Sequence, residues 1–391
     1  MRKILRNIGK SSALASLLLL LSLFLIPSLA LGESYSYTDI HPAGWIESRV
    51  TCLNTRGDVV GFGMTIDGER GFLWSSGRIT VILPPGADSA RAAWVNGRGE
   101  IAGTWVKGGI RHAFLLRGET YLDPTPGWGN SEATYVGDDG AVGGAGEFGA
   151  FVSRGGSTEI LPGLSVVVAG NSSGQFVGSG EASARLYLPD KGYLDLTPPG
   201  TLFAMPLGIN ENGRVAVTSV KDGIDKGFVY SAPFFVSMTP PGWTSSHAAA
   251  INNLEMVAGY GDSPEGRRSF LRSGGTYQVL SFPGWPATEA AAVNDLGQVA
   301  GAGTTASGET HAFVASPPGA TTSLSPGPGA SGGCAMAPRG AESETTGSAA
   351  ANLIVLFAPL FLLRGRLRKR RGYSPMILTS TRFFLRPSNS P

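Results

Sequence analysis

The chain has 391 residues, of which 15% are charged, and its formal net charge is +2. Basic residues gather at the two ends, so residues 33–332 carry 27 acidic and 18 basic side chains, a net charge of −9. A nucleic-acid-binding protein would show the opposite balance, so this composition excludes nucleic acid as a partner.

The first 32 residues have the pattern of an export signal. Four basic residues precede an apolar run over residues 17–26, and small residues follow at the predicted cleavage site after Ala30. An uncleaved anchor is the alternative. In both cases we expect the secretion machinery to carry the middle of the chain out of the cytoplasm.

Between the two ends, one sequence motif recurs seven times with a period near 40 residues. Each copy runs from small apolar residues through Asn-x-x-Gly and Val-x-Gly to an aromatic strand, then to Tyr-Leu-Asp-Leu and Pro-Pro-Gly-Trp. Asn-Gly turns and proline stops at this spacing predict four short strands per copy, which is typical of a β-propeller blade. The turns begin at Asn54, Asn96, Gly137, Asn171, Asn210, Asn252 and Asn294.

The seventh copy lacks its fourth strand, and the N-terminal residues match the missing piece. The chain passes from residues 311–314 into a Pro/Gly/Ser linker, whereas residues 35–45 resemble the fourth strand and connector of other copies. A strand that completes the last blade closes a ring and removes two exposed sheet edges. We therefore predict an all-β, seven-bladed propeller over residues 33–316, closed by the N-terminal strand. Another β-repeat architecture is the alternative.

The C-terminal region has the order of an anchoring or sorting signal. A Pro/Gly/Ser-rich linker over residues 317–347 contains Gly-Gly-Cys, which ends at Cys334. An apolar run and a cluster of six basic residues follow, and they predict a single transmembrane helix within residues 348–371. A buried soluble helix is the alternative. No role is predicted for the tail, residues 372–391.

Two resemblances follow from these motifs. The Gly-Ile-Asn-x-x-Gly-x-Val turn at residues 208–215 and the His-Ala-Phe strands at His112 and His311 resemble the HAF-type extracellular repeats of bacteria. That family carries no established activity to transfer, and copies three, four and six are degenerate. The Gly-Gly-Cys motif, apolar run and arginine cluster resemble the CTERM sorting signals of bacterial surface proteins. This second resemblance implies a sorting protease, and processing or lipid attachment at Cys334, although the spacer and the tail are longer than the compact form.

A four-strand blade places its connections on two faces of the ring. The Asn-x-x-Gly turns share the first face with the turns between third and fourth strands. The loops after Val-x-Gly, at residues 64–70, 105–111, 221–226 and 262–268, share the second face with the Pro-Gly-Trp connectors, and we expect these loops to differ in length and content. Variable loops on a rigid scaffold usually carry binding. Candidate binding residues on the second face are Trp45, Trp128, Trp243, Trp285, Asp67, Glu69, Asp222, Asp225, Asp262 and Glu265.

These candidates leave several interpretations open. In one interpretation the tryptophans form an aromatic platform that binds sugar rings or an apolar partner. In the other, each ring packs between adjacent blades. Asp138-Asp139 fits turn capping better than a calcium loop, and the four histidines are scattered, so no metal or cofactor is predicted. No catalytic residue is predicted, because the sequence contains no His-Glu-x-x-His motif and no phosphate-cradling loop.

The prediction is thus an exported binding or scaffolding module at the cell envelope, tethered by its C-terminal helix or released by processing. Its ligand would be a glycan or a protein. The alternative is a carbohydrate-active propeller enzyme of the glycosidase or lyase type, which would need two carboxyl groups about 5–9 Å apart. A structural envelope protein is the third hypothesis.

Overall fold

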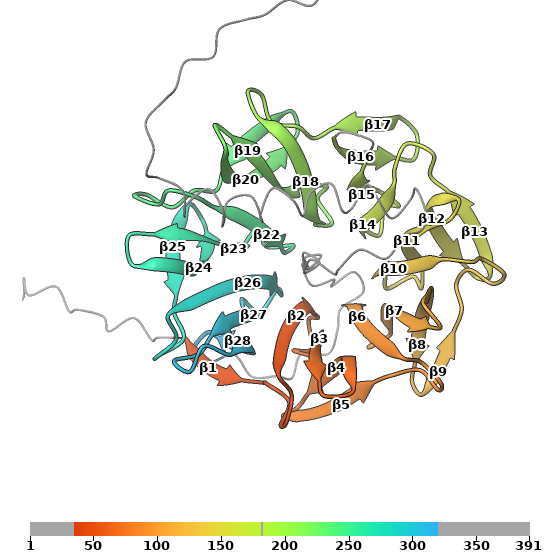
Figure 1. Ribbon diagram of the computed structural model, residues 1–391. Helices are drawn as coiled ribbons and strands as arrows, with labels where there is room; N and C mark the ends of the chain where they lie inside the picture. Colours follow the sequence, from red (N-terminus) through yellow and green to blue (C-terminus); the bar gives the residue numbers. More distant parts are fainter. Residues whose placement is uncertain (1–34, 181–182, 320–391) are drawn as a thin grey trace, which may run out of the picture. The chain divides into compact units, whose positions relative to one another are not determined.

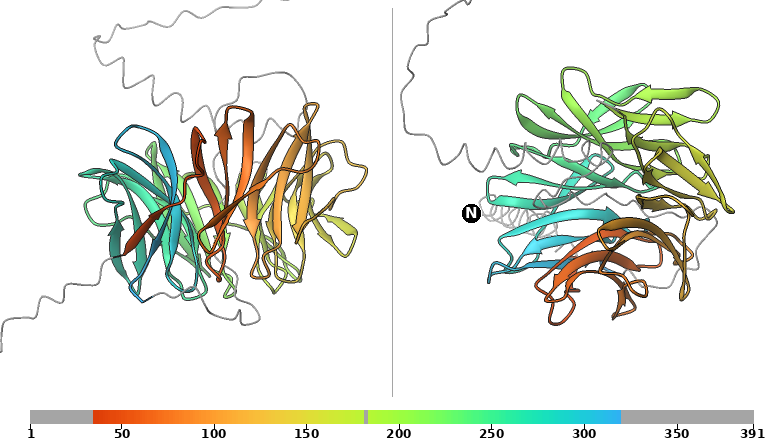
Figure 2. Two further views of the ribbon diagram at one scale, coloured as in Figure 1. Left: turned by 90° about the horizontal axis from the view of Figure 1, so that it is seen from below. Right: turned by 45° about the vertical axis from the view of Figure 1, so that its right-hand side comes forward.

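The computed structural model describes residues 35–180 and 183–319. This part of the chain forms seven four-stranded antiparallel sheets arranged as blades around a central axis (Figure 1). Figure 2 shows the blades standing side by side in two further views. The prediction of an all-β, seven-bladed propeller is therefore confirmed.

Each blade is a meander whose first strand lies nearest the axis. Blade 1 contains β2 (Glu47–Leu53), β3 (Val59–Thr65), β4 (Gly68–Ser75) and β5 (Arg78–Ile82), and blade 2 contains β6 (Ser89–Val95), β7 (Ile101–Lys107), β8 (Ile110–Arg117) and β9 (Thr120–Leu122). Blade 3 contains β10 (Ser131–Val136), β11 (Val142–Gly146), β12 (Gly149–Arg154) and β13 (Ser157–Ile160), and blade 4 contains β14 (Val166–Gly170), β15 (Phe176–Ser179), β16 (Ala184–Leu188) and β17 (Gly192–Asp195). Blade 5 contains β18 (Leu202–Ile209), β19 (Val215–Lys221), β20 (Ile224–Ser231) and β21 (Phe234–Ser237), and blade 6 contains β22 (His247–Ile251), β23 (Val257–Ser263), β24 (Gly266–Ser273) and β25 (Thr276–Leu280).

Blade 7 joins the two ends of the described chain. Its strands are β26 (Ala287–Val293), β27 (Val299–Thr304), β28 (Thr310–Ser316) and, outermost, β1 (Ser36–Asp39). β1 pairs antiparallel with β28, so that Ser36 lies opposite Ser316 and Asp39 lies opposite Phe313. Figure 1 shows the red β1 beside the blue β28. The predicted closure by an N-terminal strand is confirmed.

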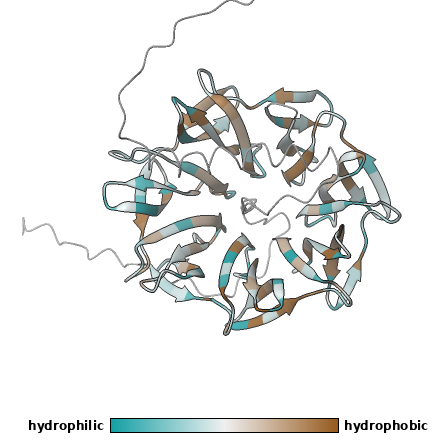
Figure 3. Cartoon of the chain, in the orientation of Figure 1, coloured by the Kyte–Doolittle hydropathy of each residue, from teal (hydrophilic) through white to brown (hydrophobic). Residues whose placement is uncertain are grey.

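In blades 1, 2, 3 and 6 the repeated Phe of the third strand packs against the repeated Gly of the second strand. The phenylalanines at this position in five third strands are fully buried. In blade 2 the Phe114 ring lies over Gly103 of the neighbouring strand β7, where any side chain would collide with it. Figure 3 shows hydrophobic residues along first strands such as β14 and β18. The five buried rings are Phe72, Phe114, Phe151, Phe270 and Phe313.

Replacing this glycine should therefore destabilise the domain. A Cβ added at Gly103 would lie within 3.0 Å of both the Arg91 carbonyl oxygen and the Phe114 ring. We expect Gly103→Ala to lower the free energy of unfolding by about 3 kcal/mol, measured by urea denaturation. Gly118→Ala, at an open turn where only the positive φ of 58° is strained, should cost about 1–2 kcal/mol. Equal losses in the two variants would contradict this packing argument.

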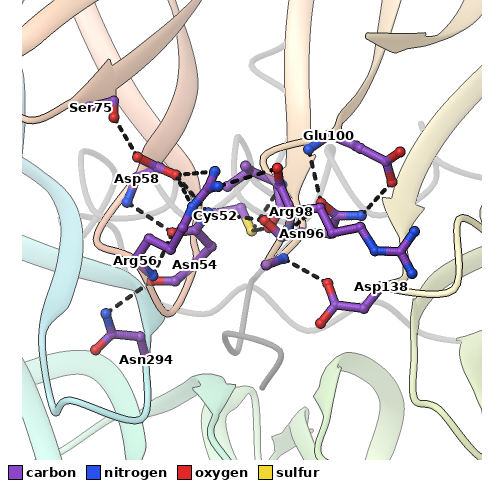
Figure 4. A network of polar contacts seen from close by, with 12 residues as sticks. Cys52, Asn54, Arg56, Asp58, Ser75, Asn96, Arg98, Glu100, Asp138 and Asn294 are labelled. Carbon is purple, nitrogen blue, oxygen red and sulfur yellow. Dashed lines mark hydrogen bonds and ion pairs between the residues drawn. The ribbon is translucent and has the colours of Figure 1, made fainter. Parts of the chain in front are cut away.

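The repeated asparagines form a belt around the axis on the first face. Each Asn side-chain oxygen accepts hydrogen bonds within its own turn, and its amide nitrogen donates to a backbone carbonyl of the next blade. Figure 4 shows Asn54, Asn96 and Asn294 in this network. Because Gly137 has no side chain, it cannot donate from blade 3 to blade 4. The six links run from Asn54 to Asn96, Asn96 to Gly137, Asn171 to Asn210, Asn210 to Asn252, Asn252 to Asn294 and Asn294 to Asn54.

Candidate functional site

The second face is built from tight hairpins. The four segments expected to differ in length all turn through two residues: 66–67, 108–109, 222–223 and 264–265. That expectation was wrong, because a glycine with positive φ in or next to each of these four turns allows the same tight reversal in blades 1, 2, 5 and 6. A longer connection joins β27 to β28 through residues 305–309. The four hairpins therefore differ in their side chains and not in their length.

The four tryptophans pack into the blades that follow them. Each lies edge-on to the buried Phe of the third strand and is partly buried itself. Trp45 also covers Gly63, and Trp285 covers Gly303, where a Cβ would collide with the indole ring. This geometry favours the packing interpretation over an open sugar platform. The ring-centroid distances are 6.0 Å for Trp45 and Phe72, 5.4 Å for Trp128 and Phe151, 5.8 Å for Trp243 and Phe270, and 6.1 Å for Trp285 and Phe313.

Four of the six candidate carboxylates do not converge. Asp67, Asp222 and Glu265 lie exposed at hairpin tips of blades 1, 5 and 6. Glu69 forms an ion pair at 2.6 Å with Arg91 of the next blade. These carboxylates therefore provide no pair across a common cleft.

Asp225 and Asp262 both lie near His247. The Asp225 carboxylate lies 3.4 Å from His247 Nε2, and the His247 ring stacks on Tyr260 with centroids 4.4 Å apart. Asp262 accepts hydrogen bonds from Ser245 and from Arg267. Burial alone would raise the pKa of Asp262, but these hydrogen bonds outweigh burial and lower it. Asp262 is therefore held as a carboxylate and is poorly suited to act as a general acid.

This cluster belongs to a repeated set of contacts between blades. Asp225 lies three residues before its third-strand Phe, and His247 lies five residues before its Asn. The same two positions hold an ion pair at three other blade junctions, with the charges reversed in two of them. Cross-blade packing therefore explains the Asp225–His247 contact. The equivalent ion pairs are Glu69–Arg91, Arg111–Glu132 and Arg267–Glu289.

Large apolar side chains are exposed on the second face of blades 1 to 3. Ile66 is 88% exposed and Phe148 is 62% exposed, each within a two-residue turn where polar residues are usual. Ile46 and Met64 lie side by side, since Ile46 N donates to the Met64 carbonyl, and Ile110 begins the third strand of blade 2. The sequence analysis missed these residues, although an Ile or Phe within a predicted hairpin turn was a detectable signal. We call Ile46, Met64, Ile66, Ile110 and Phe148 the apolar rim.

Exposed carboxylates accompany the apolar rim. Asp67 lies next to Ile66, and Glu147 lies next to Phe148. Asp88 accepts a hydrogen bond from Gly108 N in the hairpin beside Ile110. Within the part of the chain that the structure describes, these three carboxylates form no ion pair. The rim thus combines exposed apolar surface with negative charge.

Two hollows in the described surface are lined mainly by polar groups. One, of about 350 Å³, lies on the first face between blades 1 and 2 and is lined by Arg56, Asp58 and Ser75. Its lining groups bond one another: Arg56 pairs with Asp58 at 2.6 Å, and Ser75 donates to Asp58 at 2.5 Å (Figure 4). No cluster of three or more potential metal-ligating residues occurs among residues 35–180 and 183–319.

Several predictions concern residues outside the described ranges. They are the cleavage site at Ala30, the processing site at Cys334 and the transmembrane helix within residues 348–371. The residues that the structure describes contain no helix of sufficient length and apolarity to cross a membrane.

Comparison with known proteins identifies no family for this chain. No family model and no curated protein matches the chain. Similar solved structures include YCF48 bound to D1 peptide (13% identity, 77% of this chain and 100% of that chain, TM-score 0.46). They also include a prolyl endopeptidase (14%, 69% and 46%, TM-score 0.45) and TolB from Acinetobacter baumannii (11%, 71% and 65%, TM-score 0.36). The chain thus spans less than two thirds of the last two, and similarities at this level say nothing about activity or partners.

Proposed function

We propose that this chain is an exported, surface-tethered propeller that binds a protein partner through the apolar rim on its second face. The observation that carries the proposal is the exposure of Ile66 and Phe148 at hairpin tips. Clustered apolar side chains on a protein surface commonly mark interaction sites. Export by residues 1–32 and tethering or sorting by residues 331–371 are part of this proposal and rest on the sequence patterns.

The charges around the rim favour a partner with basic residues. Asp67, Asp88 and Glu147 carry negative charge beside the apolar side chains, and the middle of the chain has a net charge of −9. Complementary charges speed association and select among partners. The partner surface we propose is therefore apolar at its centre and flanked by Lys or Arg.

A carbohydrate-active enzyme is less well supported. The two candidate carboxylates near His247 are already engaged, Asp225 with His247 and Asp262 with Arg267. Glycoside hydrolysis needs one carboxyl group that stays protonated to act as the acid, whereas the pKa of Asp262 is lowered. A binding function of the second face explains why the apolar rim is exposed, whereas glycoside hydrolysis does not explain it.

The binding proposal predicts the effect of introducing charged residues into the apolar rim. We expect the double variant Ile66→Glu and Phe148→Glu to lose at least about tenfold in affinity, because a few central apolar residues usually dominate binding energy. Envelope proteins of the source organism that the full-length chain captures are first purified. The dissociation constant of each purified protein is then measured by titration with the wild type and with the double variant. A matched control is Leu254→Glu, which changes an exposed apolar residue on the first face.

Three results would count against the proposal. Equal binding by the wild type and the rim variant would exclude the rim as the site. Loss of binding in the Leu254→Glu control would indicate a general effect of the added charge. Saturable binding to purified envelope glycans, with none to proteins, would replace the protein partner by a glycan.

A further inference from the structure

Two histidines stack where the ring is closed. His41 follows β1, and His311 lies in β28, the strand with which β1 pairs. Their ring centroids are 3.8 Å apart, and the rings are nearly parallel, at 5°. Among the seven blades that the structure describes, only in blade 7 is the outermost strand not joined to its neighbour by a hairpin. Contacts between these two segments therefore help to hold the ring shut.

Hydrogen bonding defines the protonation state of His41. Trp45 O can only accept, so His41 Nε2, 3.1 Å away, carries a proton and donates it. Ala312 N donates to Ser48 Oγ at 2.9 Å, which leaves the Ser48 hydroxyl to donate to His41 Nδ1, also at 2.9 Å. Neutral His41 thus satisfies both ring nitrogens. A second proton would turn Nδ1 into a donor and deprive the Ser48 hydroxyl of its acceptor.

The charged groups around His41 belong to both segments that meet at the ring closure, the segment of β1 and the segment of β28. Asp39 Oδ2 lies 2.8 Å from His311 Nδ1, and Glu309 Oε2 lies 3.7 Å from His311 Nε2. Burial and the neighbouring His311 lower the pKa of His41, while the Trp45 carbonyl, Asp39 and Glu309 partly offset this effect. A proton on His41 would place its charge 3.8 Å from the imidazole that lies between these two carboxylates.

In blades 2 and 5 a threonine occupies the position that is equivalent to that of His41. Thr125 follows β9 and donates to Ser131 at 2.8 Å, and Thr239 follows β21 and lies 2.8 Å from Ser246. Each therefore joins the end of one blade to the start of the next, as His41 joins blade 7 to Ser48 of blade 1. A hydroxyl group serves this packing role without ionising, whereas an imidazole can take up a proton.

We propose that the His41–His311 stack is an acid-sensitive clasp, which holds β1 in blade 7 at neutral pH and loosens when His41 takes up a proton. The direction follows from linkage. The unfolded or detached segment takes up a proton near pH 6.5, whereas closed blade 7 resists protonation to a lower pH. The open form therefore binds more protons as the pH falls below about 6.5, and closure weakens.

Hydrogen exchange of the full chain tests this proposal strand by strand. We compare residues 36–39 of β1 with the outer strands β9 and β13 at pH 7.5 and pH 5.5, after correction for intrinsic exchange rates. In the wild type we expect exchange of β1 to accelerate at pH 5.5 by up to about tenfold relative to those strands, since each pH unit below the open-state pKa is worth at most tenfold. His41→Thr, which restores the hydroxyl found elsewhere in the ring, should abolish the relative acceleration.

Two further variants keep the test decisive. His112→Gln removes a histidine of blade 2 that stacks on Trp105, away from the ring closure, and should behave as the wild type does. His311→Gln keeps His41 but removes the neighbouring imidazole, so the relative acceleration should shrink. Wild-type β1 that exchanges in step with β9 and β13 at both pH values would overturn the proposal. So would equal acid acceleration in His41→Thr and the wild type.

Discussion

A chain from which residues 33–40 have been deleted should lose about 4 kcal/mol or more of its free energy of unfolding. The deletion removes the ladder between β1 and β28 and the side chain of Ile40, which is 2% exposed. It also removes two long-range hydrogen bonds, from Tyr35 to the Gly297 carbonyl and from Ser281 N to Tyr37. Burial of one Ile is worth about 1.5–3 kcal/mol, and each hydrogen bond adds about 1 kcal/mol. Such a loss is a large part of the stability of a typical domain.

The deletion should also change the association state, because β28 becomes an exposed sheet edge. Urea denaturation and light scattering measure the two effects separately. Addition of a synthetic peptide of residues 33–45 should restore the unfolding midpoint and suppress association, which distinguishes loss of the strand from general damage. A deleted chain that stays monomeric and unfolds at the wild-type midpoint would show that β1 does not close the ring.

Asn294→Ala should be the most damaging single change in the asparagine belt. The Asn294 side chain is fully buried, and its Nδ2 donates to the Asn54 carbonyl, which links blade 7 to blade 1. Its Oδ1 accepts from the backbone nitrogens of Leu296 and Gln298. Substitution by alanine leaves these buried groups without a partner, at about 1–3 kcal/mol for each unsatisfied group. We expect the free energy of unfolding to fall by about 3 kcal/mol in urea denaturation.

The natural gap in the belt limits this expectation. Blade 3 has Gly137 in place of the asparagine, and the ring still closes. We therefore expect Asn294→Ala to weaken the domain without abolishing the fold. Asn212→Ala, at an exposed turn position, is the matched control and should change stability by less than about 0.5 kcal/mol. A comparable loss in both variants would contradict a special role for the belt.

The sequence predicted the fold well because the blade is specified locally. Asn-x-x-Gly turns, the Val-x-Gly strand and the Pro stops each restrict the backbone within a few residues, and they recur at a constant period. The split seventh copy indicated closure, since residues 35–45 and 311–314 are complementary parts of one unit. Their pairing in β1 and β28 confirmed this.

The candidate site was predicted less well because it depends on contacts between blades. Trp45 and Trp285 were identified by position, but the direction of their rings depends on the glycines and phenylalanines beneath them. Four second-face loops were predicted to differ in length, yet positive-φ glycines keep each of these four hairpins at two residues. Ile66 was not predicted as a candidate, although an isoleucine within a predicted turn indicates an exposed apolar side chain.

Periodicity and backbone chemistry are local properties of the chain, so the number of blades, the order of strands and the closure of the ring could be predicted from the amino-acid sequence. The contacts between side chains of different blades could not be predicted in this way. Asp225 and His247 lie in different blades, and His41 and His311 are 270 residues apart, yet each pair is in contact. Such contacts depend on the angle between neighbouring blades and on the closed circumference, and neither quantity is encoded in the spacing of a repeat.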